Sequence, residues 1–244
     1  MRYRHEMDLM LEEAHADRER LELLERAHLK DPDNDNIRAQ LASLYIDMGR
    51  HRKALELLVG HRFRSRHGIW FLTRLYQHAN LGLGRRALKM GNPDRALQYF
   101  RDSMQPLVTL GEDLSKFRGQ TKSLYYIGLA EEARGHLKSA QRAFRKAASR
   151  HLAYLPDLQV YRAMALRKLH RKAAAERIIR QVERYLERGV GLGTLRPDYV
   201  HYMRSLIAEY RNDPVGASRE MKKAKAAGWR PSRALHFSWK RGVS

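Results

Sequence analysis

The sequence predicts an all-α fold, an α-solenoid of about six helical hairpins, and two kinds of observation indicate it. Stretches such as IRAQLASLYIDM, RALQYFRDSM and SAQRAFRKAA keep apolar residues at three- and four-residue spacing, and no segment sustains period-two alternation. The seven prolines lie mostly just before or in the first turn of such a stretch, where the fixed φ and missing N–H of proline are tolerated. We therefore expect helices joined by turns.

A recurring pattern predicts how these helices pair. A small residue is followed seven positions later by Gly or a substitute, then five positions later by Ala, and then four positions later by a large apolar residue. The small residue lets two antiparallel helices approach closely, and the Gly turns the chain between them. The copies are Ala42, Gly49, Ala54 and Leu58; Gly84, Gly91, Ala96 and Phe100; Gly128, Gly135, Ala140 and Phe144; and, more loosely, Ala163, His170, Ala175 and Ile179, and Ser205, Asn212, Ala217 and Met221.

The pattern and the apolar spacing divide the chain into hairpins of a single domain, 1–244. The predicted hairpins cover residues 4–28, 35–60, 69–104, 119–150, 156–187 and 198–227. The first is indicated by HEMDLMLEEAHADRERLELLERA. Residues 228–244 are expected to form a basic C-terminal cap or tail.

This pattern resembles the tetratricopeptide repeat, a helical hairpin of about 34 residues that stacks into a right-handed superhelix. The resemblance covers almost the whole chain, although the signature aromatic residue early in the first helix is missing. Gly49, Gly91 and Gly135 are 42 and 44 residues apart, so we expect insertions between some hairpins. The resemblance implies a non-catalytic scaffold for protein–protein interaction.

A second resemblance is to the C-terminal repeat region of large bacterial proteins that begin with a carbohydrate-enzyme-like β-sandwich domain of unknown function. The matching segments are LELLERAH, GRHRKALELL, HRFRSRHG, GRRALKMG and NPDRALQYF, in the same order. This resemblance implies a bacterial protein, and it leaves open a role as an accessory of a carbohydrate-active enzyme. No β domain is present in this chain, so no activity of that domain is carried over.

The charge of the chain points to acidic partners. Forty-eight Lys and Arg residues against 27 Asp and Glu give a formal net charge of +21, which attracts acidic protein, nucleic acid or acidic polysaccharide. The cations are spread along the chain, so a general surface property remains as open as a dedicated binding stripe. The absence of cysteine excludes disulfides and thiolate metal sites. With no long apolar window and no apolar core in MRYRHEMDLM, we expect a soluble cytoplasmic protein.

The short motifs that could carry chemistry have simpler interpretations. DPDNDN, residues 31–36, begins like a calcium loop but has Asn36 and Ala42 where that loop needs Gly and Glu, so we predict a turn and a helix cap. GLGRRA, residues 82–87, follows a predicted helix rather than a strand, which argues against dinucleotide binding. GVGLG, residues 189–193, is typical of a helix end. The twelve histidines form no metal motif. We predict no enzymatic activity, no metal and no cofactor.

The predicted partner-binding face is the inner face of the superhelix, lined by residues of the first helix in each hairpin. The predicted binding residues are His78, Arg85, Lys89, Lys122, Tyr125, Arg167, Lys168, Tyr199 and Tyr202. Cations and aromatic rings together can hold an acidic protein or peptide, or an anionic polymer such as nucleic acid or acidic polysaccharide. Several of the tyrosines could instead pack between neighbouring hairpins, and the oligomeric state stays open.

One basic stretch, HRFRSRHGIW at residues 61–70, has two open interpretations. It is either a connector between two hairpins, anchored by Phe63 and Trp70, or a basic lip beside the groove formed by Arg62, Arg64 and Arg66.

Overall fold

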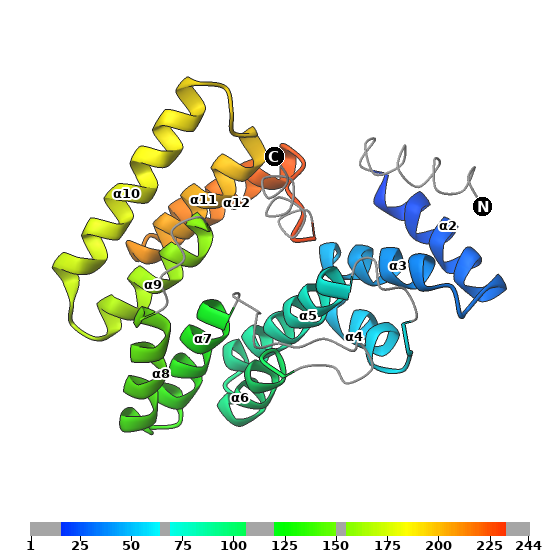
Figure 1. The fold of residues 1–244 in the computed structure, drawn as a ribbon, viewed down its shortest axis with the longest axis horizontal. Helices are drawn as coiled ribbons and strands as arrows, with labels where there is room; N and C mark the ends of the chain where they lie inside the picture. Colours follow the sequence, from blue (N-terminus) through cyan, green and yellow to red (C-terminus); the bar gives the residue numbers. More distant parts are fainter. Residues whose placement is uncertain (1–15, 64–68, 106–119, 150–154, 233–244) are drawn as a thin grey trace.

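The computed structural model describes residues 16–63, 69–105, 120–149 and 155–232. These residues form eleven helices and no strand, which confirms the predicted all-α class (Figure 1). The helices are α2 (Asp17–Lys30), α3 (Asp35–Asp47), α4 (His51–Val59), α5 (Ile69–Lys89), α6 (Pro93–Asp102), α7 (Gln120–Ala133), α8 (Leu137–Ser149), α9 (Pro156–Lys168), α10 (Lys172–Gly191), α11 (Pro197–Tyr210) and α12 (Pro214–Ala226).

Consecutive helices pack as antiparallel pairs, α3 with α4, α5 with α6, α7 with α8, α9 with α10 and α11 with α12. The pairs follow a curve in Figure 1, with α5, α7, α9 and α11 on its inner side and α6, α8 and α10 on its outer side. Residues 4–15 of the predicted first hairpin, 4–28, lie outside the described part of the chain. Within the described part, α2 packs on α3. The sequence predicts the partner-binding residues on this inner side.

In five hairpins, the residue that the sequence pattern expects to turn the chain has a left-handed backbone. The φ angle is 71° at Gly49, 73° at Gly91 and 77° at Gly135, and it is 60° at His170 and 57° at Asn212. Glycine adopts this conformation at no steric cost, and Asn and His are among the other residues that adopt it most often. The looser copies therefore keep the turn and change only the residue that makes it.

The small residue of each clear copy allows its two helices to approach closely. A Cβ atom on Gly128 would lie 2.3 Å from Cε1 of Phe144, and a Cβ on Gly84 would lie 2.3 Å from Cε1 of Phe100. Both phenylalanines are buried. The same contact between a glycine and a phenylalanine thus holds α6 against α5 and α8 against α7.

The helix starts follow from local capping. Asn34 Oδ1 accepts hydrogen bonds from the backbone N–H groups of Asn36 and Ile37, both at 3.2 Å, as expected of a turn and cap in DPDNDN. Asn92 and Asp213 cap α6 and α12 in the same way, and each is followed by a proline. The residues of GLGRRA lie inside α5, so this segment has no strand-to-helix turn.

Within HRFRSRHGIW, the described residues support a connector. Phe63 is buried and makes an edge contact with the ring of His61, whose Nε2 lies 2.6 Å from Oδ1 of Asp35. Arg62 is exposed. Arg64, Arg66 and the side chain of Trp70 lie outside the described residues, so the basic lip stays a prediction.

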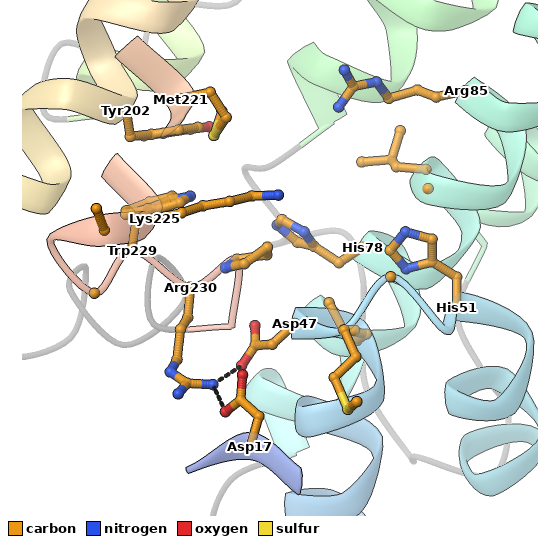
Figure 2. A pocket seen from close by; sticks show the side chains of 18 of the residues that line it. Asp17, Asp47, His51, His78, Arg85, Tyr202, Met221, Lys225, Trp229 and Arg230 are labelled. Carbon is orange, nitrogen blue, oxygen red and sulfur yellow. Dashed lines mark ion pairs between the residues drawn. The ribbon is translucent and has the colours of Figure 1, made fainter. Parts of the chain in front are cut away.

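After α12 the chain returns to its N-terminal helices through residues 228–232, the closing segment. Gly228 turns the chain with a φ of 88°. Asp47, the last residue of α3, accepts hydrogen bonds from the backbone N–H of Ser232 at 2.9 Å and from its hydroxyl at 2.6 Å. Arg230 Nη1 lies 2.5 Å from Asp17 Oδ1 and 4.0 Å from Asp47 Oδ2 (Figure 2). The side chains of Asp47 and Arg230 are only 3% and 6% exposed, so this contact between the two ends is buried.

The contact between Gly128 and Phe144 gives a test of hairpin packing. Gly128→Ala should lower the free energy of unfolding by about 1–3 kcal/mol, because the added methyl group forces Phe144 or α8 to move. Urea denaturation measures this change. Gly191→Ala is the matched control in α10, because beyond its chain neighbours and the backbone of its own helix no atom lies within 4 Å of the added Cβ. This variant should be neutral or stabilising by up to about 1 kcal/mol. Equal losses in both variants would contradict the close packing.

The closing segment predicts a specific pH dependence of stability. Burial raises the pKa of Asp47 to about 6, although the hydrogen bonds from Ser232 and the charges of Arg230 and Arg20 lower it. Because an unfolded Asp titrates near pH 4, the folded chain binds an extra proton between about pH 4 and 6. This contribution to stability is complete below about pH 4 and is lost as the pH rises through about 6.

Asp47→Asn removes the carboxyl group that titrates. Denaturation curves of the wild type and of this variant at a series of pH values therefore isolate the contribution of Asp47. The free energy of unfolding of the wild type, minus that of Asp47→Asn, should fall by about 3 kcal/mol between pH 4 and pH 7. Parallel pH profiles for the two proteins would show that Asp47 is not buried against the closing segment.

Candidate functional site

A repeated contact between a cation and a tyrosine runs along the inner side of the curve. Arg85 Cζ of α5 lies 5.6 Å from the ring centre of Tyr126 on α7, and Lys122 Nζ of α7 lies 5.2 Å from the ring centre of Tyr161 on α9. Arg167 Cζ of α9 lies 5.3 Å from the ring centre of Tyr210 on α11. At these distances the ring face attracts a cation. We call these three contacts the cation–tyrosine ladder.

Aromatic packing fixes the tyrosines of this ladder. The ring centres of Tyr126 and Tyr161 are 5.9 Å apart, and Tyr126 also stacks on Phe100 at 5.3 Å. Tyr126 and Tyr161 are buried, and burial is the main cause that raises the pKa of each phenol. The rings are thus neutral, rigid supports on which the cations rest.

A cavity with a volume of about 680 Å³ opens beside this ladder. Of the predicted binding residues, His78, Arg85, Lys122 and Tyr202 line it. Its other walls come from the N-terminal helices and from the closing segment, and Figure 2 shows His78 and Arg85 facing the side chains of α12 and the closing segment across it. Four predicted residues from three helices therefore meet at one site.

The surroundings of Lys122 disfavour its protonated, charged form. Burial, and then the positive charge of Arg85, lowers the pKa of Lys122 to about 8, while the carboxylates of Asp157 and Glu209 oppose this shift. Among the described residues, no carboxylate oxygen lies within 4.0 Å of the side-chain nitrogens of Arg85 or Lys122. The two cations are therefore held near each other without a paired anion.

His78 responds to the same charges. Burial, and then the positive charges of Lys122, Arg74, His51 and Arg85, lowers the pKa of His78 well below its usual value. The imidazole is neutral at pH 7 and can act as a hydrogen-bond donor or acceptor. A negative group in the cavity would counteract the part of this shift that the surrounding cations cause.

A smaller cavity of about 220 Å³ holds three further predicted residues, Tyr125, Arg167 and Lys168, together with Glu209. Lys168 Nζ is already engaged, at 2.5 Å from Glu132 Oε2. Tyr125 packs against Tyr161 at 5.8 Å between ring centres. This second site is thus smaller and closer to charge balance than the first.

The remaining predicted residues are dispersed. Lys89 is exposed at the end of α5 and lines neither cavity. Tyr199 packs with its ring centre 6.3 Å from that of Trp229, as expected for a tyrosine that packs between elements. Tyr202, which lines the cavity, also stacks on Trp229 at 4.0 Å with an angle of 12° between the rings.

Sequence reasoning missed several residues of the site. Tyr126 and Tyr161 were not predicted, although the ladder depends on them, and Tyr210 was missed in the same way. Lys225 and Trp229 line the cavity from α12 and the closing segment, but the repeat pattern ends before Trp229. The only sequence signal for Trp229 is a large aromatic residue directly after a glycine that ends a helix.

The described residues contain no group of three or more His, Asp or Glu side chains that could hold a metal ion. Within the same residues, no helix combines the length and the apolar character needed to cross a membrane.

Comparison with known proteins assigns one part of the chain. No curated protein matches the sequence significantly, and no catalytic family model was found. A model of the tetratricopeptide repeat matches residues 11–62, which include α2, α3 and α4. In general terms this repeat implies a role in protein–protein interaction and is usually non-catalytic. Residues 11–62 are thus similar to a tetratricopeptide repeat, and the paired helices that follow are consistent with the same architecture.

Proposed function

We propose that this protein is a non-catalytic scaffold that binds an acidic protein or peptide on its inner face. The observation that carries the proposal is the pair Arg85 and Lys122, which are supported by tyrosines and have no carboxylate within ion-pair distance in the described chain. Carboxylate side chains of a partner would form charge-assisted hydrogen bonds with them. The match to a tetratricopeptide repeat supports protein as the class of partner.

The charges around the ladder favour a peptide over a long anionic polymer. Asp157 and Glu209 act on Lys122 from the same inner face, so the positive potential is interrupted. A polymer that carries a charge on every unit would meet these carboxylates, whereas a peptide can place neutral residues opposite them.

Charge reversal tests this proposal. Fluorescence anisotropy with a panel of Asp- and Glu-rich peptides of about ten residues should detect binding to the full chain. Arg85→Glu and Lys122→Glu should each weaken binding about tenfold or more, because each replaces an attraction with a repulsion. Circular dichroism establishes that the variants fold.

Arg142→Glu and Arg145→Glu are matched controls, since both residues are exposed on α8, on the outer side of the curve. Equal weakening by the controls would show that net charge, and not the inner face, attracts the peptide. Single-stranded DNA and heparin are titrated in parallel. If they bind with a steep dependence on salt while no peptide binds, the protein is instead a binder of anionic polymers.

A further inference from the structure

The cavity beside the ladder contains a third cation that the proposed function does not use. Lys225 of α12 lines it together with Arg85 and Lys122. Figure 2 shows the amine of Lys225 reaching from one side of the cavity toward His78, while the guanidinium of Arg85 extends into it from the other. Among the described residues, no carboxylate oxygen lies within 4.0 Å of the Lys225 amine. Three helices therefore contribute three cations to one cavity.

The acidic residues in the wall of the cavity do not balance these cations. Asp47 is bound to Ser232, and Asp17 is paired with Arg230. Figure 2 shows this group of side chains together, on the opposite side of His78 from Arg85. The two carboxylates that line the cavity are thus already bound to Ser232 and Arg230, whereas Asp157 and Glu209 act on Lys122 from outside the cavity lining.

The cavity also has an aromatic wall. Trp229 is buried and stacks on Tyr202, and both line the cavity together with Met221. The volume of about 680 Å³ is within the range of sites for small organic molecules. A ligand can therefore place a charged group near the cations and a planar or apolar part against Trp229.

We infer that this cavity binds a phosphate monoester, with the phosphate between Arg85, Lys122 and Lys225 and the organic part against Trp229. A planar carboxylate is satisfied by one bidentate arginine, whereas a tetrahedral dianion offers three oxygens to donors that approach from different helices. The charges of Lys122 and Arg85 act on His78 as well, and its neutral imidazole can donate a hydrogen bond to a phosphate oxygen. This inference goes beyond the proposed function, although the two share Arg85 and Lys122.

Calorimetry with three probes tests the chemistry of the ligand. The full chain is titrated with phenyl phosphate, inorganic phosphate and benzoate at pH 7.5. Phenyl phosphate should bind about tenfold more tightly than either of the others, because only it combines a dianion with a ring. Benzoate that binds as tightly as phenyl phosphate, or no binding of phenyl phosphate at millimolar concentration, would overturn the inference.

Two substitutions test the location. Lys225→Gln should weaken phenyl phosphate binding about tenfold, whereas Lys222→Gln, an exposed residue of the same helix that does not line the cavity, should leave it unchanged. Trp229→Leu should remove the preference for phenyl phosphate over inorganic phosphate. Equal affinities of the two lysine variants would place the site elsewhere.

His78 provides a readout that does not depend on affinity. Its imidazole signal, assigned by comparison with His78→Gln, should shift on titration with phenyl phosphate, and its pKa should rise in the complex because the dianion opposes the surrounding cations. A His78 signal that stays unchanged at saturation would contradict binding in this cavity.

A short phosphoserine peptide separates two sources of the same chemistry. Tighter binding of this peptide than of phenyl phosphate would indicate a phosphorylated partner protein, and the reverse would indicate a small metabolite; both support the phosphate site. Binding of acidic peptides without any phosphate binding would overturn the site and leave the proposed function standing. Phosphate binding without acidic peptide binding would support the phosphate site and overturn the proposed function.

Discussion

The shape of the inner face depends on the buried contact of Asp47 with Arg230 and Ser232. Asp47 and Ser232 are 185 positions apart, so this contact joins two parts of the chain that are distant in sequence. It consists of two hydrogen bonds to Asp47 and an ion pair between Arg230 and Asp17. This contact joins the closing segment to α2 and α3, and Trp229 lies in the same segment and lines the cavity. Packing between neighbouring helices forms the hairpins, whereas the cavity lies between helices of several hairpins and the closing segment.

The features predicted well from sequence are those that local backbone physics determines. The turn positions Gly49, Gly91 and Gly135 were identified by spacing, and their left-handed backbone confirms them. His170 and Asn212 were recognised as substitutes because they occupy the same register. Gly84 and Gly128 are close-packing positions in the sequence pattern. In the structure, the rings of Phe100 and Phe144 occupy the space that a Cβ atom on Gly84 or Gly128 would need. Each of these requirements involves residues within a single hairpin.

The features missed from sequence depend on contacts between hairpins or between chain ends. The inner side was assigned to Tyr125 in α7, but Tyr126 supports Arg85, because the pairing depends on how α5 and α7 are rotated relative to each other. Trp229 and Arg230 follow the last repeat and were assigned to a cap or tail. Nothing in the residues around Asp47 indicates that it binds Ser232. Such contacts follow from the accumulated geometry of all the hairpins, which a repeat pattern does not contain.

The net charge of +21 indicates an acidic partner but not where that partner binds. Exposed cations such as Arg142 and Arg145 lie in solvent, where salt screens them within about 10 Å. Arg101 and Arg134 are paired with Glu131. Arg85 and Lys122 differ from both groups, because they are packed on buried rings, lack a carboxylate partner within the described chain and lower the pKa of His78. Lys122 is also partly buried, so an added anion beside it gains more than it would on the open surface. The location of the unpaired cations, and not the number of cations, therefore determines the candidate site.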